Sequence, residues 1–360
     1  MNSTIPEHAP VIFDNRDIAR YTRGERRMPM RGFDPEYTDI VDYIIRITHR
    51  IWEEKAIGYI YETYQHNCVL HGSSGDVHGR EAVVAATLQS LAACPDDRTI
   101  ASDVIWSGNE DDGFHTSHLI HGTARNSGWS SYGPPTNRKL TWRTIANCLA
   151  RDNMIFEEWI LRDETSVIRQ MGLDLDEIVQ RQAHALLVSG NTAEPVGDIA
   201  GPRGQYAPAR YVPRSAGRFE IEDFIRDTYN EIWNRRMFNV IPARYASSTV
   251  GYMPGNTTLH GPSAISGFLM NLFGMFPDLG VTVDQVYANG DDTQGYHVAV
   301  RWTLSGTHTG YGIYGDPSAA RVRVMGLSQH HVQQGQITKE YMFLDEMEIL
   351  RRIALRRLVA

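Results

Sequence analysis

The stretch MIFEEWILRDE at residues 154–164 returns as QITKEYMFLDE at residues 336–346, 182 positions later. Five short motifs coincide in this register, among them HGREAV at 78–83 with HGPSAI at 260–265. Upstream the offset is 181, so the second copy has one extra residue in the loop before His260. The repeat predicts two homologous domains, because two copies are too few for a solenoid.

Composition shifts along the chain predict four segments. A polar, arginine-bearing arm covers residues 1–36, and the first domain covers 37–187. A stretch rich in Gly, Pro and Ala, typical of a linker, covers 188–218. The second domain covers 219–360.

Each copy has the same predicted order of elements. An amphipathic helix opens the copy, a short helix ends at an x-Pro-Asp, and strands rich in β-branched and aromatic residues follow. The turns of the final hairpins are Asp152-Asn153 and Gln334-Gly335. Helices followed by an antiparallel sheet define an α+β fold. A curved sheet with helices on one face would leave a pocket between them.

Composition excludes several classes of function. The 360 residues are 42% hydrophobic and 22% charged, with a formal net charge of −8. An acidic chain is a poor binder of nucleic acid, and no apolar run reaches the ~20 residues that span a bilayer. The first residues lack the pattern of a signal peptide.

The three cysteines form no C-x-x-C, so we expect reduced thiols in the cytoplasm. Nucleotide-binding and α/β-hydrolase motifs are absent.

Asp163 and Asp345, at the ends of the two closing strands, are the candidate catalytic acids or bases. A carboxylate at the end of an apolar strand costs free energy if it is buried without a partner. Desolvation would raise its pKa and make it a usable general base or acid. The alternative interpretation is that each aspartate only caps the turn that follows.

His330 and His331 are the candidate catalytic partners on the preceding strand. Adjacent strand residues face opposite ways, so only one of them can face the pocket. The two-residue turn at 334–335 places His330 on the face of Asp345, and one β-bulge would exchange it for His331. Copy one has Cys148 here, so a His–Asp pair is predicted only in copy two. A surface or internally satisfied histidine is the alternative.

Further polar and aromatic side chains are candidates for lining the pocket. The aromatic residues also carry the core periodicity, so core packing is the alternative for them. His308 could instead belong to an edge loop. The predicted substrate-binding residues are Tyr341, His308, Trp302, Trp233, Tyr245, Trp159, Trp52, Tyr64 and His71.

Three histidines crowd one strand of copy one, but they do not predict a metal site. Alternation puts His115 and His121 on one face and His118 on the other. A zinc site needs three or four converging ligands. We therefore predict no metal.

The order of motifs in each copy resembles the SnoaL-like polyketide cyclases of the NTF2-like superfamily. The shared features are H-G-x-x-A, x-P-D, Y-G-x-P-[TS] and a closing x-I-x-x-E-[WY]-x-x-x-D. Copy two also has the G-T-H-x-G pattern at 306–310, and residues 168–173 are similar to the family's R-Q-L-G-L tail. The resemblance covers both domains.

This resemblance implies two tandem cone-shaped α+β barrels, each a curved sheet closed by helices around a mostly apolar pocket without a cofactor. It implies acid/base chemistry by an Asp with a nearby His, on a C–H next to a carbonyl. The expected function is a cyclase, isomerase or lyase acting on a small apolar carbonyl compound. The alternatives are a non-catalytic small-ligand-binding protein and a structural module. The tandem copies are expected to pair as a pseudo-dimer within the chain, with a homodimer as the other possibility.

Overall fold

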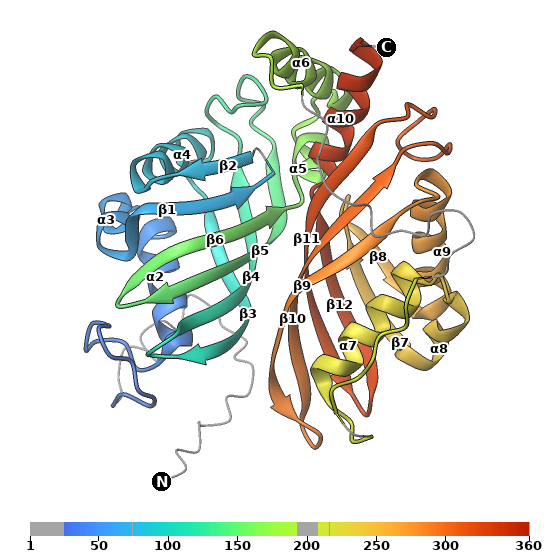
Figure 1. Cartoon of the computed structure of the whole chain (residues 1–360). Coiled ribbons are helices and arrows are strands. Elements are labelled where there is room, and N and C mark those ends of the chain that lie inside the picture. The colour runs from blue at the N-terminus through green and yellow to red at the C-terminus, as the bar shows by residue number, and fades with distance from the viewer. Residues whose placement is uncertain (1–24, 74, 193–207, 216, 360) are drawn as a thin grey trace. The chain divides into compact units, whose positions relative to one another are not determined.

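The chain divides into two units, Met1–Leu173 and Asp174–Ala360 (Figure 1). None of the described helices is both long and apolar enough to cross a membrane. The first 24 residues of the predicted arm, and residues 193–207 and 216 of the predicted linker, lie outside the described residues. The computed structural model describes residues 25–73, 75–192, 208–215 and 217–359.

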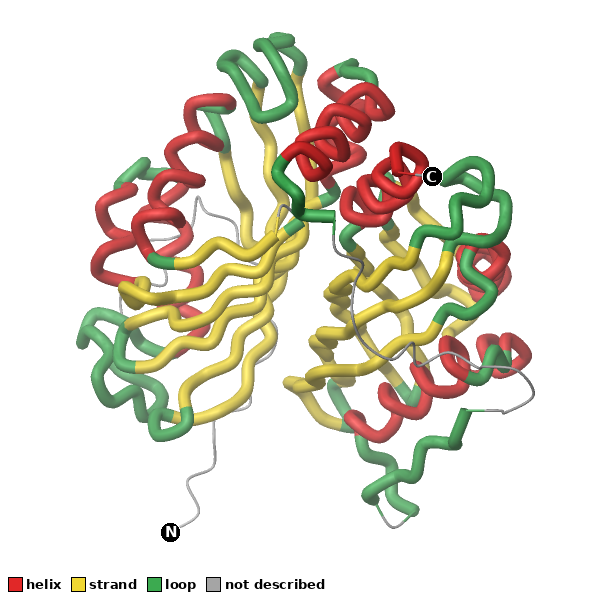
Figure 2. The backbone as a smooth tube through the Cα atoms, turned by 45° about the horizontal axis from the view of Figure 1, so that its top comes forward, coloured by secondary structure: helices red, strands yellow, loops and turns green. Residues whose placement is uncertain are grey.

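Unit 1 is a six-stranded sheet in the order β2-β1-β6-β5-β4-β3, with helices packed on one face (Figures 1 and 2). All neighbouring strands are antiparallel except β1 and β6, which are parallel. Its strands are β1 (Tyr64–Gly72), β2 (Gly75–His78), β3 (Arg98–Asn109), β4 (Gly113–Arg125), β5 (Lys139–Arg151) and β6 (Met154–Arg162). Its helices are α2 (Ile40–Trp52), η2 (Ile57–Tyr59), α3 (Ile60–Thr63), α4 (Arg80–Ala93) and α5 (Glu164–Met171).

Unit 2 repeats this sheet in the order β8-β7-β12-β11-β10-β9, with β7 parallel to β12. Its strands are β7 (Tyr245–Met253), β8 (Thr257–His260), β9 (Gly280–Asp291), β10 (Gly295–Thr307), β11 (Arg321–Gln333) and β12 (Gln336–Leu344). Its helices are α6 (Leu175–Val188), α7 (Ile221–Tyr229), η3 (Asn230–Asn234), η4 (Phe238–Val240), α8 (Ile241–Arg244), α9 (Gly261–Met275) and α10 (Glu346–Val359).

The repeat predicted from sequence matches the strand bounds. Strands β3 to β6 begin and end 182 residues before β9 to β12, whereas β1 begins 181 residues before β7. The extra residue lies in the β7–β8 turn, just before His260. Two tandem α+β units are therefore confirmed. The departure from the expected antiparallel sheet is the parallel pair in each unit.

The closing hairpins have the predicted two-residue turns. Asp152, Asn153, Gln334 and Gly335 all have positive φ, between 49° and 71°, as a tight hairpin turn of the primed type requires. The β11–β12 ladder then shifts register at His331, the bulge left open by the sequence.

Helix α6 belongs with unit 2 rather than with the first domain, where the boundary at 187 placed it. Its residues Ile178, Val179 and Ala183 are buried, and the helix packs along α10. The side chain of Arg351 on α10 also donates to Gln182, at 3.4 Å. The apolar stripe of α6 therefore serves the unit that follows it in the chain.

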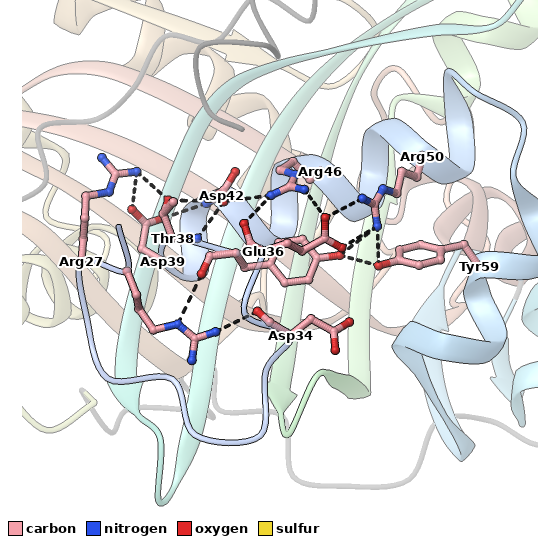
Figure 3. Close-up of polar contacts among 11 residues, drawn as sticks. Arg27, Asp34, Glu36, Thr38, Asp39, Asp42, Arg46, Arg50 and Tyr59 are labelled. Carbon is pink, nitrogen blue, oxygen red and sulfur yellow. Dashed lines mark hydrogen bonds and ion pairs between the residues drawn. The ribbon is translucent and has the colours of Figure 1, made fainter. Parts of the chain in front are cut away.

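The described part of the arm is tied to unit 1 (Figure 3). Arg27 pairs with Asp39 at 2.6 Å, and Glu36 pairs with Arg50 at 2.7 Å and with Arg46. Between these ion pairs, apolar side chains enter the core that α2 forms with the sheet. These core side chains are Met28, Met30, Phe33 and Tyr37.

A tryptophan packed directly against a glycine of the neighbouring strand occurs in each unit. A Cβ built on Gly326 would lie 2.2 Å from the Trp302 ring, and one on Gly122 would lie 2.1 Å from the Trp142 ring. Trp302 is fully buried, so its ring has no room to withdraw. Glycine is thus required at these two positions for the tryptophans to pack flat.

We expect Gly326→Ala to destabilise unit 2 by about 1–3 kcal/mol, the usual cost of overpacking a core. The control is Gly267→Ala on α9, where a Cβ meets nothing within 4 Å. That change should be neutral or stabilise by about 0.5–1 kcal/mol through helix propensity. Urea unfolding of both variants measures the difference. Equal stabilities would contradict the tight Trp302 contact.

Candidate functional site

A cavity of about 250 Å³ lies inside unit 1, between α2, α4 and the inner face of the sheet. Its wall is apolar along α2, where Ile44, Ile47 and Ile51 face inward. Polar side chains enter from the opposite wall at alternate strand positions. A mostly apolar enclosure with a few polar groups is the usual form of a small-molecule site.

Glu158 is the central polar group of this cavity. It lies on β6 and is buried, and the Tyr64 hydroxyl donates a hydrogen bond of 2.9 Å to it. Desolvation raises the pKa of the Glu158 carboxyl to about 7, and the Tyr64 hydrogen bond opposes this rise. Among the described residues only Tyr64 donates to this carboxyl. A carboxyl that titrates near neutral pH can take up or release a proton during turnover.

His118, on β4, lines the same cavity. Its side chain is 2% exposed, and its Nε2 has no hydrogen-bond partner among the described residues. Desolvation lowers its pKa to about 4, against a weaker opposing effect of Asp103. The imidazole is therefore neutral at pH 7 and can donate or accept one hydrogen bond with a ligand.

A second cluster of polar side chains lines the cavity near the end of β6. Arg162 pairs with Glu164 through two contacts of 2.9 and 3.0 Å, and the Tyr132 hydroxyl donates to Glu164 at 2.6 Å. Asp97 also lines this end. Burial raises the pKa of the Asp97 carboxyl to about 6, while Lys55 and Arg162 lower it.

Unit 2 keeps the carboxyl–tyrosine pair, with both side chains buried. The Tyr245 hydroxyl donates to Glu340 at 3.1 Å, and desolvation raises the pKa of Glu340 to about 7. His330 contacts the Tyr229 hydroxyl at 3.1 Å, and its Nδ1 lies 3.8 Å from Glu340. Burial lowers the pKa of His330 to about 3, so this histidine is neutral.

The two interiors differ at matched positions. Three positions carry larger side chains in unit 2: Thr48 against Tyr229, Ile120 against Trp302 and Cys148 against His330. Six polar lining positions of unit 1 are buried apolar residues in unit 2. These pairs are Thr87/Leu269, Ser90/Leu272, Asp97/Leu279, Thr99/Val281, His118/Val300 and Arg162/Leu344. At these matched positions unit 1 therefore has smaller or polar side chains around its cavity, whereas unit 2 has larger or apolar ones.

Both predicted catalytic aspartates cap helices. Asp163 accepts from the Ser166 backbone N–H at 3.3 Å, and Asp345 accepts from that of Glu348 at 2.9 Å. The bulge in β11–β12 brings the Asp345 backbone opposite Met325. The structure therefore does not bring Asp345 together with His330, whose neighbour across the strands is Glu340. The catalytic role of both aspartates stays a prediction.

The other predicted residues are dispersed. Trp52 and Tyr64 line the cavity of unit 1, whereas Trp233, Tyr245 and Trp302 belong to the filled core of unit 2. Five others form ring contacts outside the cavity lining. His71 stacks on Trp159 at 5.4 Å and Tyr341 stacks on Tyr252 at 4.7 Å. His308 packs beside Phe276 at 5.3 Å, and the His331 ring lies 3.8 Å from that of His297.

Sequence reasoning missed Glu158, His118, Asp97 and Arg162. A signal for Glu158 was present, because Glu158 and Glu340 occupy matched positions in the closing motif, as do Tyr64 and Tyr245. The aspartates of the same motif drew the assignment instead. His118 was placed on the strand face opposite His115, and that face is the one that lines the cavity.

Residues 224–353 match the family model of the SnoaL-like polyketide cyclases. The matched range lies within unit 2, so the resemblance seen in the sequence is confirmed for the second copy: residues 224–353 form a SnoaL-like domain, in an architecture of two tandem α+β units with the same strand order. No curated protein sequence matches the chain.

Solved structures similar to one unit include proteins of several bacteria. A Jannaschia protein assigned as a SnoaL-like polyketide cyclase is 22% identical, over 37% of this chain and 90% of its own, with a TM-score of 0.34. A SnoaL-like polyketide cyclase of Agrobacterium tumefaciens is 17% identical, over 37% and 96%, at 0.31. A protein of Catenulispora acidiphila with a ketosteroid isomerase-like fold, in complex with trimethylamine, is 16% identical, over 37% and 92%, at 0.31.

The buried Glu340 makes stability depend on pH with a definite sign. Its folded pKa is raised from 4.5 to about 7, so the folded state binds the proton more tightly and stability falls as pH rises from about 4.5 to 7. Glu340→Gln keeps an acceptor for Tyr245 without the charge. We expect it to be more stable than the parent above pH 7 by about 3 kcal/mol.

Urea unfolding of Glu340→Gln at several pH values measures this gain, which should vanish below pH 4.5. Glu62→Gln, at an exposed glutamate, controls for the loss of one charge. A gain that does not depend on pH would contradict the buried, protonatable carboxyl.

Proposed function

We propose that unit 1 is an acid/base enzyme of the isomerase, cyclase or lyase type, acting on a small carbonyl compound. The observation that carries the proposal is the buried Glu158 carboxyl, which faces a cavity and titrates near neutral pH. In unit 2 the matching Glu340 carboxyl is only 1% exposed and lies beside the Tyr245 hydroxyl and the His330 ring.

The proposed chemistry begins with proton abstraction. The Glu158 carboxylate takes a proton from the carbon next to the substrate carbonyl, and the electron pair of the broken C–H bond moves onto the carbonyl oxygen. Tyr64 fixes one carboxylate oxygen and leaves the other for the substrate. The neutral His118 imidazole, with Nε2 protonated, donates a hydrogen bond to the developing enolate oxygen. Return of the proton to a different carbon or face completes an isomerisation.

Exchange of the α-protons of 2-tetralone in D₂O, followed by NMR, tests this proposal. The protein should speed exchange above the buffer rate, and Glu158→Gln should remove roughly 10²–10⁴-fold of that acceleration. The rate should rise with pH to a plateau with a midpoint near 7, since the base acts in its deprotonated form. The pKa of His118 is about 4, so its protonation does not change the exchange rate near pH 7.

Matched controls separate this site from the aspartates predicted by sequence. Asp163→Asn and Asp345→Asn keep a capping side chain, because asparagine caps as well as aspartate. If either variant lost α-proton exchange while its stability stayed unchanged, that aspartate would be the catalytic base in place of Glu158. Binding of 2-tetralone without exchange would instead support the non-catalytic binding protein, and neither binding nor exchange would favour the structural module.

Pairing of the two units as a pseudo-dimer, formation of a homodimer, and a cytoplasmic location remain proposals. The three cysteines are free and buried, which is compatible with a reducing compartment.

A further inference from the structure

The cavity of unit 1 has two polar ends on one strand. Glu158, Ile160 and Arg162 alternate along β6 and all line the cavity. Glu158 and Arg162 are four positions apart on the strand, so their backbone positions are separated by about 13 Å. A ligand whose reacting carbon lies at Glu158 would therefore extend toward Arg162 and its neighbours.

Asp97 is an unsatisfied acceptor at this far end. It follows α4, is 5% exposed and lines the cavity. Its Oδ1 is buried and has no hydrogen-bond partner among the described residues. Lys55 is close, but its ammonium donates to the backbone oxygen of Asp97, at 2.8 Å. A buried carboxylate oxygen without a donor costs free energy that a donor on a ligand would recover.

Arg162 does not turn this end into an anion site. Its Nε and one Nη donate side-on to the two carboxylate oxygens of Glu164, and the Tyr132 hydroxyl also donates to Glu164. The Arg162–Glu164 pair is neutral overall, and the Lys55 ammonium lies against the backbone oxygen of Asp97, so the described residues offer no unpaired cation at this end to hold an anion, and the free Asp97 carboxylate oxygen faces the ligand. A neutral hydrogen-bond donor fits this end, whereas an anionic group would be repelled.

Unit 2 shows that these charges are not needed to build the fold. Its matching residues are Leu279 for Asp97 and Leu344 for Arg162, and both are core residues. The Tyr132–Glu164 contact, in contrast, persists there as Tyr314–Glu346, at 3.1 Å. The two charged residues therefore occur only in the unit with the cavity, and together.

We propose that Asp97 is a specificity-determining residue that accepts a hydrogen bond from a hydroxyl group of the substrate, at the end of the cavity opposite the reacting carbon. The substrate class is then a hydroxylated cyclic ketone rather than a purely apolar or anionic carbonyl compound. The assignment of the reacting end rests on the function proposed above, whereas the affinity for the hydroxyl does not.

Binding of three bicyclic ketones, measured by calorimetry, tests the proposal. The probes are 2-tetralone, 6-hydroxy-2-tetralone and 6-carboxy-2-tetralone, which differ only at the end far from the carbonyl. The hydroxyl compound should bind about tenfold tighter than 2-tetralone, the gain of one hydrogen bond to a charged acceptor. The carboxylate should bind more weakly than 2-tetralone.

Two variants and one control test whether Asp97 causes the preference for the hydroxyl compound. The double change Asp97→Leu with Arg162→Leu installs the residues of unit 2 and should bring the affinity ratio of the hydroxyl compound to 2-tetralone close to one. Asp97→Asn, which keeps the side-chain volume, should reduce the ratio several-fold. Asp96→Asn, next to Asp97 but absent from the cavity lining, should leave the ratio as in the parent.

Equal affinities of 2-tetralone and its hydroxyl derivative for the parent protein would overturn the proposal, as would a preference that survives Asp97→Leu with Arg162→Leu. Tighter binding of the carboxylate would also overturn it. Binding is measured without turnover, so this failure is distinct from that of the proposed function. The latter would appear as the absence of α-proton exchange in a protein that still prefers the hydroxyl compound.

Discussion

A buried glutamate held by a tyrosine of the neighbouring parallel strand is the interaction around which each unit is organised. Glu158 with Tyr64, and Glu340 with Tyr245, place a carboxyl where β6 or β12 runs beside the first strand of its unit. Burying a carboxylate with a single donor is costly, and the raised pKa in both units expresses that cost. The rest of each interior has to accommodate this group.

The units resolve the constraint in opposite ways. Unit 2 surrounds Glu340 with large side chains, and the neutral His330 and Tyr229 form a polar core that excludes solvent. Unit 1 places smaller residues at the same positions and leaves a cavity against Glu158. Tight packing of a core stabilises a fold, whereas a cavity forfeits contacts. The hollow unit therefore sacrifices packing that its own duplicate shows to be attainable on the same scaffold.

Local chemistry made much of the fold predictable. The repeat predicted matching strands in the two copies, and the two-residue turns at Asp152-Asn153 and Gln334-Gly335 formed as expected because each contains Asn or Gly, which adopt positive φ readily. The bulge at His331 was not predictable, since one inserted residue leaves no local signature. That single residue moves His330 off the strand face of Asp345, which is the exchange with His331 that the sequence analysis had left open. The parallel β1–β6 contact, which brings Tyr64 to Glu158, is equally non-local.

The site was harder to predict because its decisive property is empty space. Side-chain volumes at Thr48, Ile120 and Cys148 combine only once α2, β4 and β5 are packed together. The pKa values do not distinguish the two units either, since those of Glu158 and Glu340 are both raised to about 7. A perturbed carboxyl marks a functional site only when something can reach it. Access to the carboxyl, rather than its pKa, is what differs between Glu158 and Glu340, because desolvation raises both pKa values alike and only Glu158 lines the cavity.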